Sequence, residues 1–432
     1  MLRRLICSAW ILAVAPAALA QENWPQWRGP EQNGVGESTN LPTSWSLDEN
    51  IVWKTKLPSW SGGTPVTWGD RVLLTSPSPA LNEEEQEPGG KEVFLLCLSR
   101  KDGHELWRVK LDHGNRLYLK HNDTSPSPVT DGKHVWVMTG TGKVYAVTMD
   151  GEVVWTRDVQ KDYGEFGLNF GYASSPLLHD GKLIIEVLHG VRTDDPSYVM
   201  ALNAETGETM WRVERPTDAV RESPDAYTTP ALLKHDGKIQ IVISGGDYVT
   251  GHDPQTGKEV WRAGGLNPEG RGNYRIVGSP MVVDGIVYAP TRRRPLLALA
   301  AGGTGDVTDS LVWKWDGSGS PDVPTPACDG TYFYMVDDRG RATCLNAKTG
   351  EVLWGPERTA EGVVSASPLL ADGKLYSLNE YAVTTVMSAG PEFKILATNE
   401  LDGTYTLSSP VVAGSQLFIR TATHLYCIGK TN

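Results

Sequence analysis

One ten-residue phrase occurs twice in this chain. Residues 202–211 read LNAETGETMW and residues 345–354 read LNAKTGEVLW, so the two copies differ at three positions. Weaker copies are LSRKDGHELW (98–107), VTMDGEVVW (147–155) and HDPQTGKEVW (252–261). Self-similarity of this kind is the signature of a repeat architecture, so we interpret the phrase as a structural unit rather than a functional site.

A second recurring phrase sets the period of the repeat. It begins with Ser-Pro or Thr-Pro and continues with an apolar pair and a tight turn, as in SPLLHDGKLIIEV (175–187). Each unit contains about four strand signals, and helical periodicity is almost absent. The sequence therefore predicts an all-β fold, an eight-bladed β-propeller of four-stranded blades. The prolines that mark the eight units are Pro65, Pro128, Pro176, Pro230, Pro280, Pro326, Pro368 and Pro410.

Tryptophan is frequent in this chain, with 15 residues. Seven of them stand at equivalent places on the predicted outermost strands. Because aromatic side chains bury the largest apolar areas, we expect these seven to fill the gaps between neighbouring blades. They are Trp53, Trp107, Trp155, Trp211, Trp261, Trp313 and Trp354. The seventh unit departs from the pattern, with EFKILATNEL (392–401) in place of a Trp strand.

The last unit lacks its outermost strand. A matching strand, NIVWKTKL (50–57), stands near the beginning of the chain. We expect this N-terminal strand to complete the last blade, which would close the ring and remove the free sheet edges. We predict that residues 21–49 form an N-terminal arm that lies across the ring, with Trp24 and Trp27 as anchors, and that residues 50–432 form the propeller.

The first 20 residues, MLRRLICSAWILAVAPAALA, have a basic start, an apolar stretch and a small-residue end. This pattern predicts a signal peptide over residues 1–20, cleaved near Ala20-Gln21. The mature protein is therefore expected to be periplasmic or secreted. No later stretch approaches the ~18 apolar residues of a membrane span, so we expect no transmembrane segment.

Charge and cysteine content limit the remaining function classes. The formal net charge is −12, which argues against a nucleic-acid partner. The sequence shows no ligand spacing typical of zinc, and we predict no metal site and a monomeric protein.

The first and third strands of a blade lie roughly 9.5 Å apart, and a disulfide needs Cα atoms within about 7 Å. We therefore expect buried free thiols at the four cysteines that follow the signal: Cys97, Cys328, Cys344 and Cys427.

Propellers usually bind ligands on the ring axis, through the loops that enter the innermost strands. Polar and aromatic residues of four such loops are our candidates for one mouth of the channel. They are Asn122, Asp123, Asn169, Tyr172, Asp225, Tyr227, Asn273, Tyr274 and Arg275. The alternative is that they are solvated or satisfy one another. A separate run, RRR (292–294), is either an exposed hairpin or a site for an anion or acidic partner.

The pattern Ala-x-[Asp/Asn]-x-x-Thr-Gly-x-x-x-Trp in LNAETGETMW and LNAKTGEVLW resembles the tryptophan-docking motif of the PQQ-like repeat superfamily. The resemblance extends over all eight units and suggests a secreted member of undefined activity. It implies one of two kinds of protein: a quinoprotein dehydrogenase that holds PQQ and Ca²⁺ on the axis, or a BamB-type scaffold without a cofactor. The chain has no adjacent Cys-Cys pair, its loops are short, and no residue matches the catalytic Asp or the calcium ligands of the dehydrogenases.

These observations favour a non-catalytic binding or scaffold module without a cofactor, whose ligand is a cell-envelope protein or a small molecule. The alternative is a PQQ- and calcium-dependent quinoprotein dehydrogenase. A third hypothesis, a hydrolase or lyase that uses carboxylates on the axis, has no positive signal in the sequence.

Overall fold

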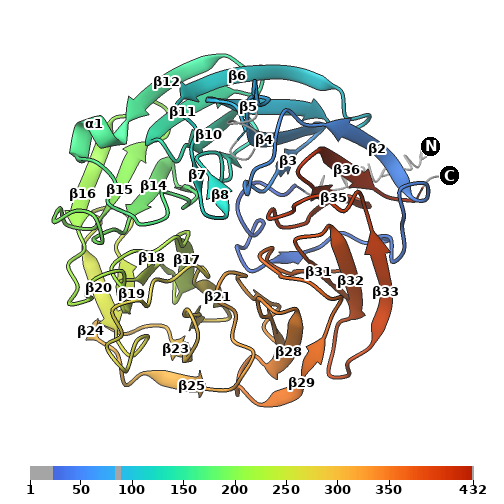
Figure 1. Ribbon diagram of the computed structural model, residues 1–432. Helices are drawn as coiled ribbons and strands as arrows, with labels where there is room; N and C mark the ends of the chain where they lie inside the picture. Colours follow the sequence, from blue (N-terminus) through green and yellow to red (C-terminus); the bar gives the residue numbers. More distant parts are fainter. Residues whose placement is uncertain (1–22, 83–88, 431–432) are drawn as a thin grey trace, which may run out of the picture.

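The structure is a computed structural model that describes residues 23–82 and 89–430. Its strands form eight sheets of four or five strands, arranged as blades around a central axis (Figure 1). The predicted all-β, eight-bladed propeller is therefore confirmed. The signal peptide predicted over residues 1–20 lies outside the described residues. Within residues 23–82 and 89–430, no helix is long and apolar enough to cross a membrane.

The first four blades follow one another along the chain, each with strands in sequence order from the axis outward. Blade 1 contains β3 (Val66–Trp68), β4 (Arg71–Pro77), β5 (Glu92–Ser99) and β6 (Glu105–His113). Blade 2 contains β9 (Val129–Thr130), β10 (His134–Met138), β11 (Lys143–Thr148) and β12 (Val153–Asp158). Blade 3 contains β13 (Leu177–His179), β14 (Lys182–Val187), β15 (Tyr198–Asn203) and β16 (Thr209–Glu214). Blade 4 contains β17 (Ala231–His235), β18 (Lys238–Gly245), β19 (Tyr248–His252) and β20 (Glu259–Ala263).

The last four blades complete the ring. Blade 5 contains β21 (Met281–Val283), β22 (Ile286–Ala289), β23 (Leu296–Ala300) and β25 (Leu311–Trp315). Blade 6 contains β26 (Ala327–Cys328), β27 (Tyr332–Val336), β28 (Arg341–Asn346) and β29 (Val352–Arg358). Blade 7 contains β30 (Leu369–Ala371), β31 (Lys374–Leu378), β32 (Val383–Ser388) and β33 (Ile395–Glu400). Blade 8 contains β34 (Val411–Ala413), β35 (Gln416–Arg420), β36 (His424–Ile428) and β2 (Ile51–Lys56).

A few short elements lie outside this scheme. A two-stranded hairpin, formed by β7 (Leu117–Tyr118) and β8 (His121–Asn122), lies within the connection between blades 1 and 2. One short helix, α1 (Val159–Tyr163), follows β12. Two short strands add to blade edges in parallel: β1 (Val35–Gly36) pairs with β30, and β24 (Gly305–Asp306) pairs with β20.

The outermost strand of blade 8 comes from the beginning of the chain. Strand β2 pairs antiparallel with β36, and Trp53 stands opposite Cys427. This pairing confirms the predicted closure of the ring by an N-terminal strand. All four described cysteines are buried and free, as expected.

Local turn chemistry explains the ten-residue phrase of the opening repeat. The side chain of Asn203 accepts hydrogen bonds from the backbone N–H groups of Glu205 (2.9 Å) and Thr206 (3.1 Å), which closes the turn after β15. Gly207 then adopts a φ of 74°, a conformation that favours glycine. The chain leaves this turn as β16, where Trp211 stands on the outer edge of the blade.

The indole rings of these strands reach the next blade. Trp155 of blade 2 donates from Nε1 to the carbonyl of Ala204 in blade 3 at 3.0 Å. Its ring covers Gly207, where a Cβ would lie 2.7 Å from the ring atoms. The same bond to a carbonyl of the next blade is made by Trp53, Trp107, Trp211, Trp313 and Trp354.

Trp261 differs from the other six. Its Nε1 donates to Gln240 Oε1 of its own blade at 2.7 Å, so the expected bond to the next blade is absent at this position. The physical reason lies in the connection after β23. Here the chain forms β24, which pairs with β20 from Trp261 to Arg262, and this pairing joins blades 4 and 5. The ring of Trp261 is still buried, in a cluster that includes Leu297 and Val307.

The seventh blade has no such Trp strand, and the arm supplies an indole instead. Trp45 is 4% exposed and belongs to a cluster that also contains residues of blades 7 and 8. Its backbone N–H donates to Asn399 Oδ1 of β33 at 2.9 Å, and its ring stacks on Tyr376 with centroids 6.4 Å apart. The seam between these blades is thus sealed by a residue more than 300 positions away in the sequence.

Candidate ligand site on the propeller axis

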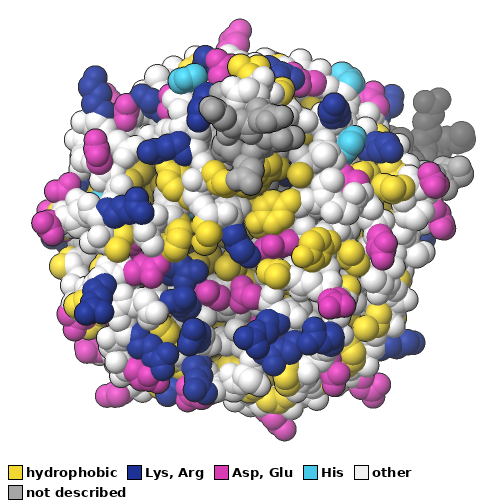
Figure 2. Space-filling view, viewed as in Figure 1, with side chains coloured by type: hydrophobic (Ala, Val, Ile, Leu, Met, Phe, Trp, Pro, Cys, Tyr) yellow, Lys and Arg dark blue, Asp and Glu magenta, His cyan; other side chains and the backbone are white. Residues whose placement is uncertain are grey.

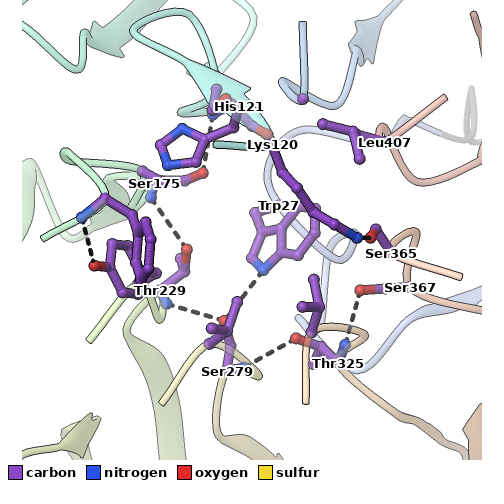
Figure 3. Close-up of a pocket in the computed structure, with 18 of the residues that line it drawn as sticks. Trp27, Lys120, His121, Ser175, Thr229, Ser279, Thr325, Ser365, Ser367 and Leu407 are labelled. Carbon is purple, nitrogen blue, oxygen red and sulfur yellow. Dashed lines mark hydrogen bonds between the residues drawn. The ribbon is translucent and has the colours of Figure 1, made fainter. Parts of the chain in front are cut away.

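Eight hydroxyl groups form a closed ring around the axis. Each belongs to the Ser or Thr that precedes a marker proline, and its oxygen accepts a hydrogen bond from the backbone N–H of the equivalent residue in the preceding blade. The eight N···O distances lie between 2.9 and 3.3 Å. Figure 3 shows part of this ring. Its members are Thr64, Ser127, Ser175, Thr229, Ser279, Thr325, Ser367 and Ser409.

The N-terminal arm closes the channel on one side of this ring. Trp24 pairs with Thr67 in blade 1, and Pro25 accepts from Thr130 in blade 2 at 2.9 Å. Gln32 bonds the carbonyl of Pro230 in blade 4 at 2.9 Å. Together with the β1–β30 pairing, these contacts tie the arm to blades on opposite sides of the ring.

Arg28 anchors the centre of the arm. Its side chain is 2% exposed and donates to the carbonyls of Pro326 and Pro368, each at 2.7 Å. Burial lowers the pKa of this guanidinium to about 9. Gly34 packs directly on it, since a Cβ there would lie 1.8 Å from Nη2. A buried cation paired with carbonyl dipoles therefore lies beneath the hydroxyl ring.

Trp27 forms the base of a cavity of ≈200 Å³ on the other side of the ring. Its Nε1 donates to Ser279 Oγ at 3.4 Å (Figure 3). Above it the wall consists of ring hydroxyls and of apolar and aromatic side chains, among them Phe170, Tyr227 and Leu407. Figure 2 shows hydrophobic side chains around the centre of this face.

The β7–β8 hairpin projects toward the centre of the ring (Figure 1), and residues 118–121 line the mouth of the cavity. Leu119 at its tip is 77% exposed and has a φ of 57°. Lys120 reaches across to blade 7, where its Nζ lies 2.7 Å from Glu380 Oε1 and 3.3 Å from Ser365 Oγ. The hydroxyl of Tyr405 donates to the carbonyl of Lys120 at 3.3 Å. These contacts hold the hairpin as a strap from blade 1 to blade 7.

Of the nine candidate loop residues, two line the cavity: Tyr227 and Arg275. The hydroxyl of Tyr227 accepts from the N–H of Phe170 at 3.1 Å. Arg275 lies over the Phe170 ring at 5.5 Å, and its Nη2 is 3.4 Å from Asp322 Oδ2. Both side chains are thus held by neighbours and present an aromatic and a cationic surface to the cavity.

Three of the other candidates are buried and brace the loops around the cavity. Asn122 bonds the carbonyl of Trp60 and the hydroxyl of Thr124, at 3.1 and 2.6 Å. Asp123 Oδ2 accepts from the N–H of Arg116 at 2.8 Å. Burial raises the pKa of Asp123 to about 6, and it has the same effect on Asp225.

Asp225 Oδ2 accepts from the N–H of Asn169 at 2.7 Å, so these two candidates are brought together. Tyr172 is 1% exposed, and its hydroxyl donates to the carbonyl of Glu186. Asn273 is exposed, and its carbonyl accepts from Arg292. Tyr274 is buried and bonds the backbone of Arg294. The side chains of these residues support the loops instead of lining the cavity.

Sequence reasoning missed most of the lining. The sequence analysis identified the Ser-Pro and Thr-Pro pairs only as markers of each repeat. Because every marker proline follows a Ser or Thr, this pattern could also have predicted a ring of hydroxyl groups. Lys120, His121 and Phe170 also line the cavity, and they stand one or two positions from the candidates Asn122 and Asn169. Ser125 Oγ is buried and has no hydrogen-bond partner within the described part of the chain.

The donor set does not fit a calcium-bound quinone. Ca²⁺ takes oxygen ligands, chiefly carboxylates, and no Asp or Glu is among the described residues that line the cavity. Two carboxylates that contact lining residues, Glu380 and Asp322, are bound to Lys120 and Arg275. Among residues 23–82 and 89–430, no group of three or more His, Cys, Asp and Glu could hold a metal ion.

Comparison with known proteins identifies the family. The sequence profile described as outer membrane protein assembly factor BamB matches residues 90–354 and 304–423. The chain belongs to this family. BamB of Bordetella pertussis is 22% identical over 419 residues, covering 95% of this chain and 92% of that protein. BamB of Moraxella catarrhalis superposes with a TM-score of 0.60 at 16% identity, over 88% of this chain and 98% of that chain.

Alcohol dehydrogenases match shorter parts of this BamB-family chain. The quinohemoprotein alcohol dehydrogenase ADH-IIG of Pseudomonas putida is 33% identical over 285 residues, 59% of this chain and 34% of that enzyme. Methanol dehydrogenase subunit 1 of Methylobacterium organophilum is 30% identical over 154 residues, 33% of this chain and 23% of its own length. A europium-containing methanol dehydrogenase superposes with a TM-score of 0.72 at 11% identity, over 94% and 98% of the two chains, which shows a shared fold.

Proposed function

We propose that this protein is a non-catalytic binding module of the cell envelope whose partner or ligand engages the axial cavity and the β7–β8 strap. The observation that carries the proposal is the composition of the cavity, a ring of hydroxyls and aromatic walls above a closed base. Such a surface offers apolar contact and hydrogen bonds, the usual features of a binding pocket. The membership in a family named for outer membrane protein assembly supports an envelope protein as the partner.

The cavity supplies little for catalysis. Among its described lining residues, no hydroxyl shares a hydrogen bond with His121, whose Nδ1 lies 3.3 Å from the carbonyl of Asn122. Burial lowers the pKa of His121. An activated nucleophile needs a base within hydrogen-bond distance. Binding without turnover is therefore the function that this geometry supports best.

A site-specific photo-crosslinker in place of Leu119 tests the proposal in the living envelope. The matched control is the same crosslinker in place of Leu311, which is 43% exposed on the outer strand β25. We expect one defined envelope protein to be captured from position 119 and not from 311. The same products from both positions would contradict a binding site at the mouth.

The alternative, a PQQ- and calcium-dependent dehydrogenase, is tested on the purified mature protein. PQQ is titrated with and without Ca²⁺ while Trp fluorescence and dye reduction with mixed alcohols and sugars are followed. We expect neither calcium-dependent tight binding nor turnover, because the described lining residues include no carboxylate for the metal. Calcium-dependent dye reduction would replace the scaffold proposal with the enzyme.

A further inference from the structure

A second cavity lies on the same face as the mouth, outside the axis. It is formed by the connection from β20 to β21 and by the short connection between β22 and β23, and its volume is ≈90 Å³. It shares no lining residue with the axial cavity. Its lining comprises Asn267, Pro268, Glu269, Arg271, Tyr274, Arg293 and Arg294.

The backbone of both walls is fixed by buried side chains. Asn267 accepts from the N–H of Arg271 at 3.0 Å and donates to the carbonyl of the same residue at 2.9 Å, which clamps the first wall. The hydroxyl of Tyr274 accepts from the N–H of Arg294 at 3.0 Å and donates to the carbonyl of Arg294, which ties the second wall to the first. The walls are therefore held in place before any ligand arrives, which lowers the entropic cost of binding.

The charges of this cavity are unbalanced. Arg271 is paired with Glu269, with Nε 2.7 Å from Oε2. Within residues 23–82 and 89–430, Arg293 and Arg294 have no ion pair, although both are exposed. The Arg294 guanidinium donates a long hydrogen bond from Nη1 to the carbonyl of Asp316 at 3.5 Å. Three guanidinium groups therefore face one carboxylate in a protein whose formal net charge is −12.

The nearby carboxylates already have cationic partners outside the lining, although Asp322 also interacts electrostatically with Arg293. Asp316 Oδ2 lies 3.1 Å from Lys314 Nζ. Asp322 Oδ2 lies 3.4 Å from Arg275 Nη2 and 3.7 Å from Arg292 Nε. Figure 2 shows Lys and Arg side chains gathered on this half of the face, over blades 4 to 6.

We propose that this cavity binds a phosphate group, either free or carried by an anionic lipid headgroup. Planar guanidinium forks match the oxygens of phosphate and form charge-assisted hydrogen bonds that are stronger than neutral ones. The small volume admits one oxyanion, with its carrier in solvent. The proposal is independent of the function assigned to the axial cavity, since the two sites have separate linings.

The test uses ³¹P NMR line widths of inorganic phosphate titrated into the full mature chain at constant ionic strength. The test variant is R293Q/R294Q. The control is R339Q, because Arg339 is also exposed, has no ion pair in the described chain and lies in the corresponding β27–β28 connection. We expect saturable broadening with the wild type and R339Q, and binding weakened roughly tenfold or more in R293Q/R294Q, since two charge-assisted hydrogen-bonding groups are lost.

Co-sedimentation with vesicles distinguishes the two sources of phosphate. Vesicles containing phosphatidylglycerol are compared with vesicles of phosphatidylcholine alone. Selective sedimentation of the wild type and R339Q, but not of R293Q/R294Q, would assign the site to a lipid headgroup. Phosphate binding without sedimentation would assign it to soluble phosphate. Binding that R293Q/R294Q retains, an equal loss in R339Q, or no binding in either assay would overturn the proposal.

Discussion

The indole Nε1 of Trp27 donates to Ser279 Oγ at 3.4 Å, although 252 residues separate the two in sequence. Ser279 also accepts the N–H of Thr229 at 2.9 Å, as one member of the hydroxyl ring. One contact thus joins the N-terminal arm to the hydrogen-bonded ring at the centre of the propeller. Ser279 therefore contributes both to the base of the axial cavity and to the hydrogen-bonded ring.

Replacing Trp27 by Ala should destabilise the protein by about 2 kcal/mol, less than the 3–5 kcal/mol of a fully buried Trp because the ring is half-buried. The loss arises from the packing of the indole on the axis and from its bond to Ser279. Urea unfolding measures the change, with Trp27→Phe as the control that retains an aromatic base. An unchanged midpoint for the alanine variant would show that the arm does not depend on Trp27.

Replacing Gly207 by Ala should weaken the seam between blades 2 and 3. The new Cβ would lie 2.7 Å from the Trp155 ring. Gly373 is a matched control, because its φ of 66° is close to the 74° of Gly207 and nothing lies within 4 Å of its Cβ position. Both variants carry the same backbone strain, so the difference between them isolates the overpacking, about 1–3 kcal/mol. Equal unfolding free energies would contradict the docking of Trp155 on this turn.

Glu186 should make the stability of the wild type fall as the pH rises. It is 1% exposed, its Oε1 accepts from Thr228 Oγ1 at 2.8 Å, and its Oε2 has no partner. Burial raises its pKa from 4.5 to about 8. The folded state therefore binds a proton that the unfolded state has released between these two values. This contribution is fully present below pH 4.5 and is lost as the pH rises toward 8.

The measurement compares the wild type with Glu186→Gln by urea unfolding at several pH values. The glutamine cannot ionise, so the free energy of unfolding of the wild type should fall relative to the variant by about 1.4 kcal/mol per pH unit within this window. A difference between the two proteins that is independent of pH would show that Glu186 ionises normally in the folded state.

Replacing Lys120 by Ala should loosen the strap over the cavity with little effect on global stability. Its ion pair with Glu380 is partly exposed, and such pairs contribute about 1 kcal/mol or less. Hydrogen exchange followed by mass spectrometry should show faster exchange in peptides that cover residues 117–122. Lys110→Ala, which removes an ion pair with Glu92 on blade 1, is the control. The same exchange rate in both variants would mean that Lys120 does not hold the hairpin.

The number of blades and the closure of the ring could be predicted from the sequence. Each unit, and the strand that the last unit lacks, can be recognised from residues that lie close together along the chain. The Asn203 turn, the positive φ of Gly207 and the Trp four residues later form a contiguous phrase. The site could be predicted only in part. Tyr227 and Arg275 line the cavity. The Asn122 amide instead bonds the carbonyl of Trp60, and Asp123 accepts from the N–H of Arg116. The direction of a loop side chain depends on packing with other loops, which one sequence does not display.

By itself, the sequence determined the repeat, the strand order within each blade and the match between β2 and the incomplete last blade, because each can be recognised from patterns within short segments of the chain. Tertiary structure alone decided the hydroxyl ring, the bonds of Arg28 to the carbonyls of Pro326 and Pro368, and the exception at Trp261. In the ring, each Ser or Thr finds its partner in the next blade, 42 to 63 positions away for seven of the eight bonds. Only the closed ring brings such groups within hydrogen-bond distance of one another, since the bond requires an orientation between blades that no local pattern specifies.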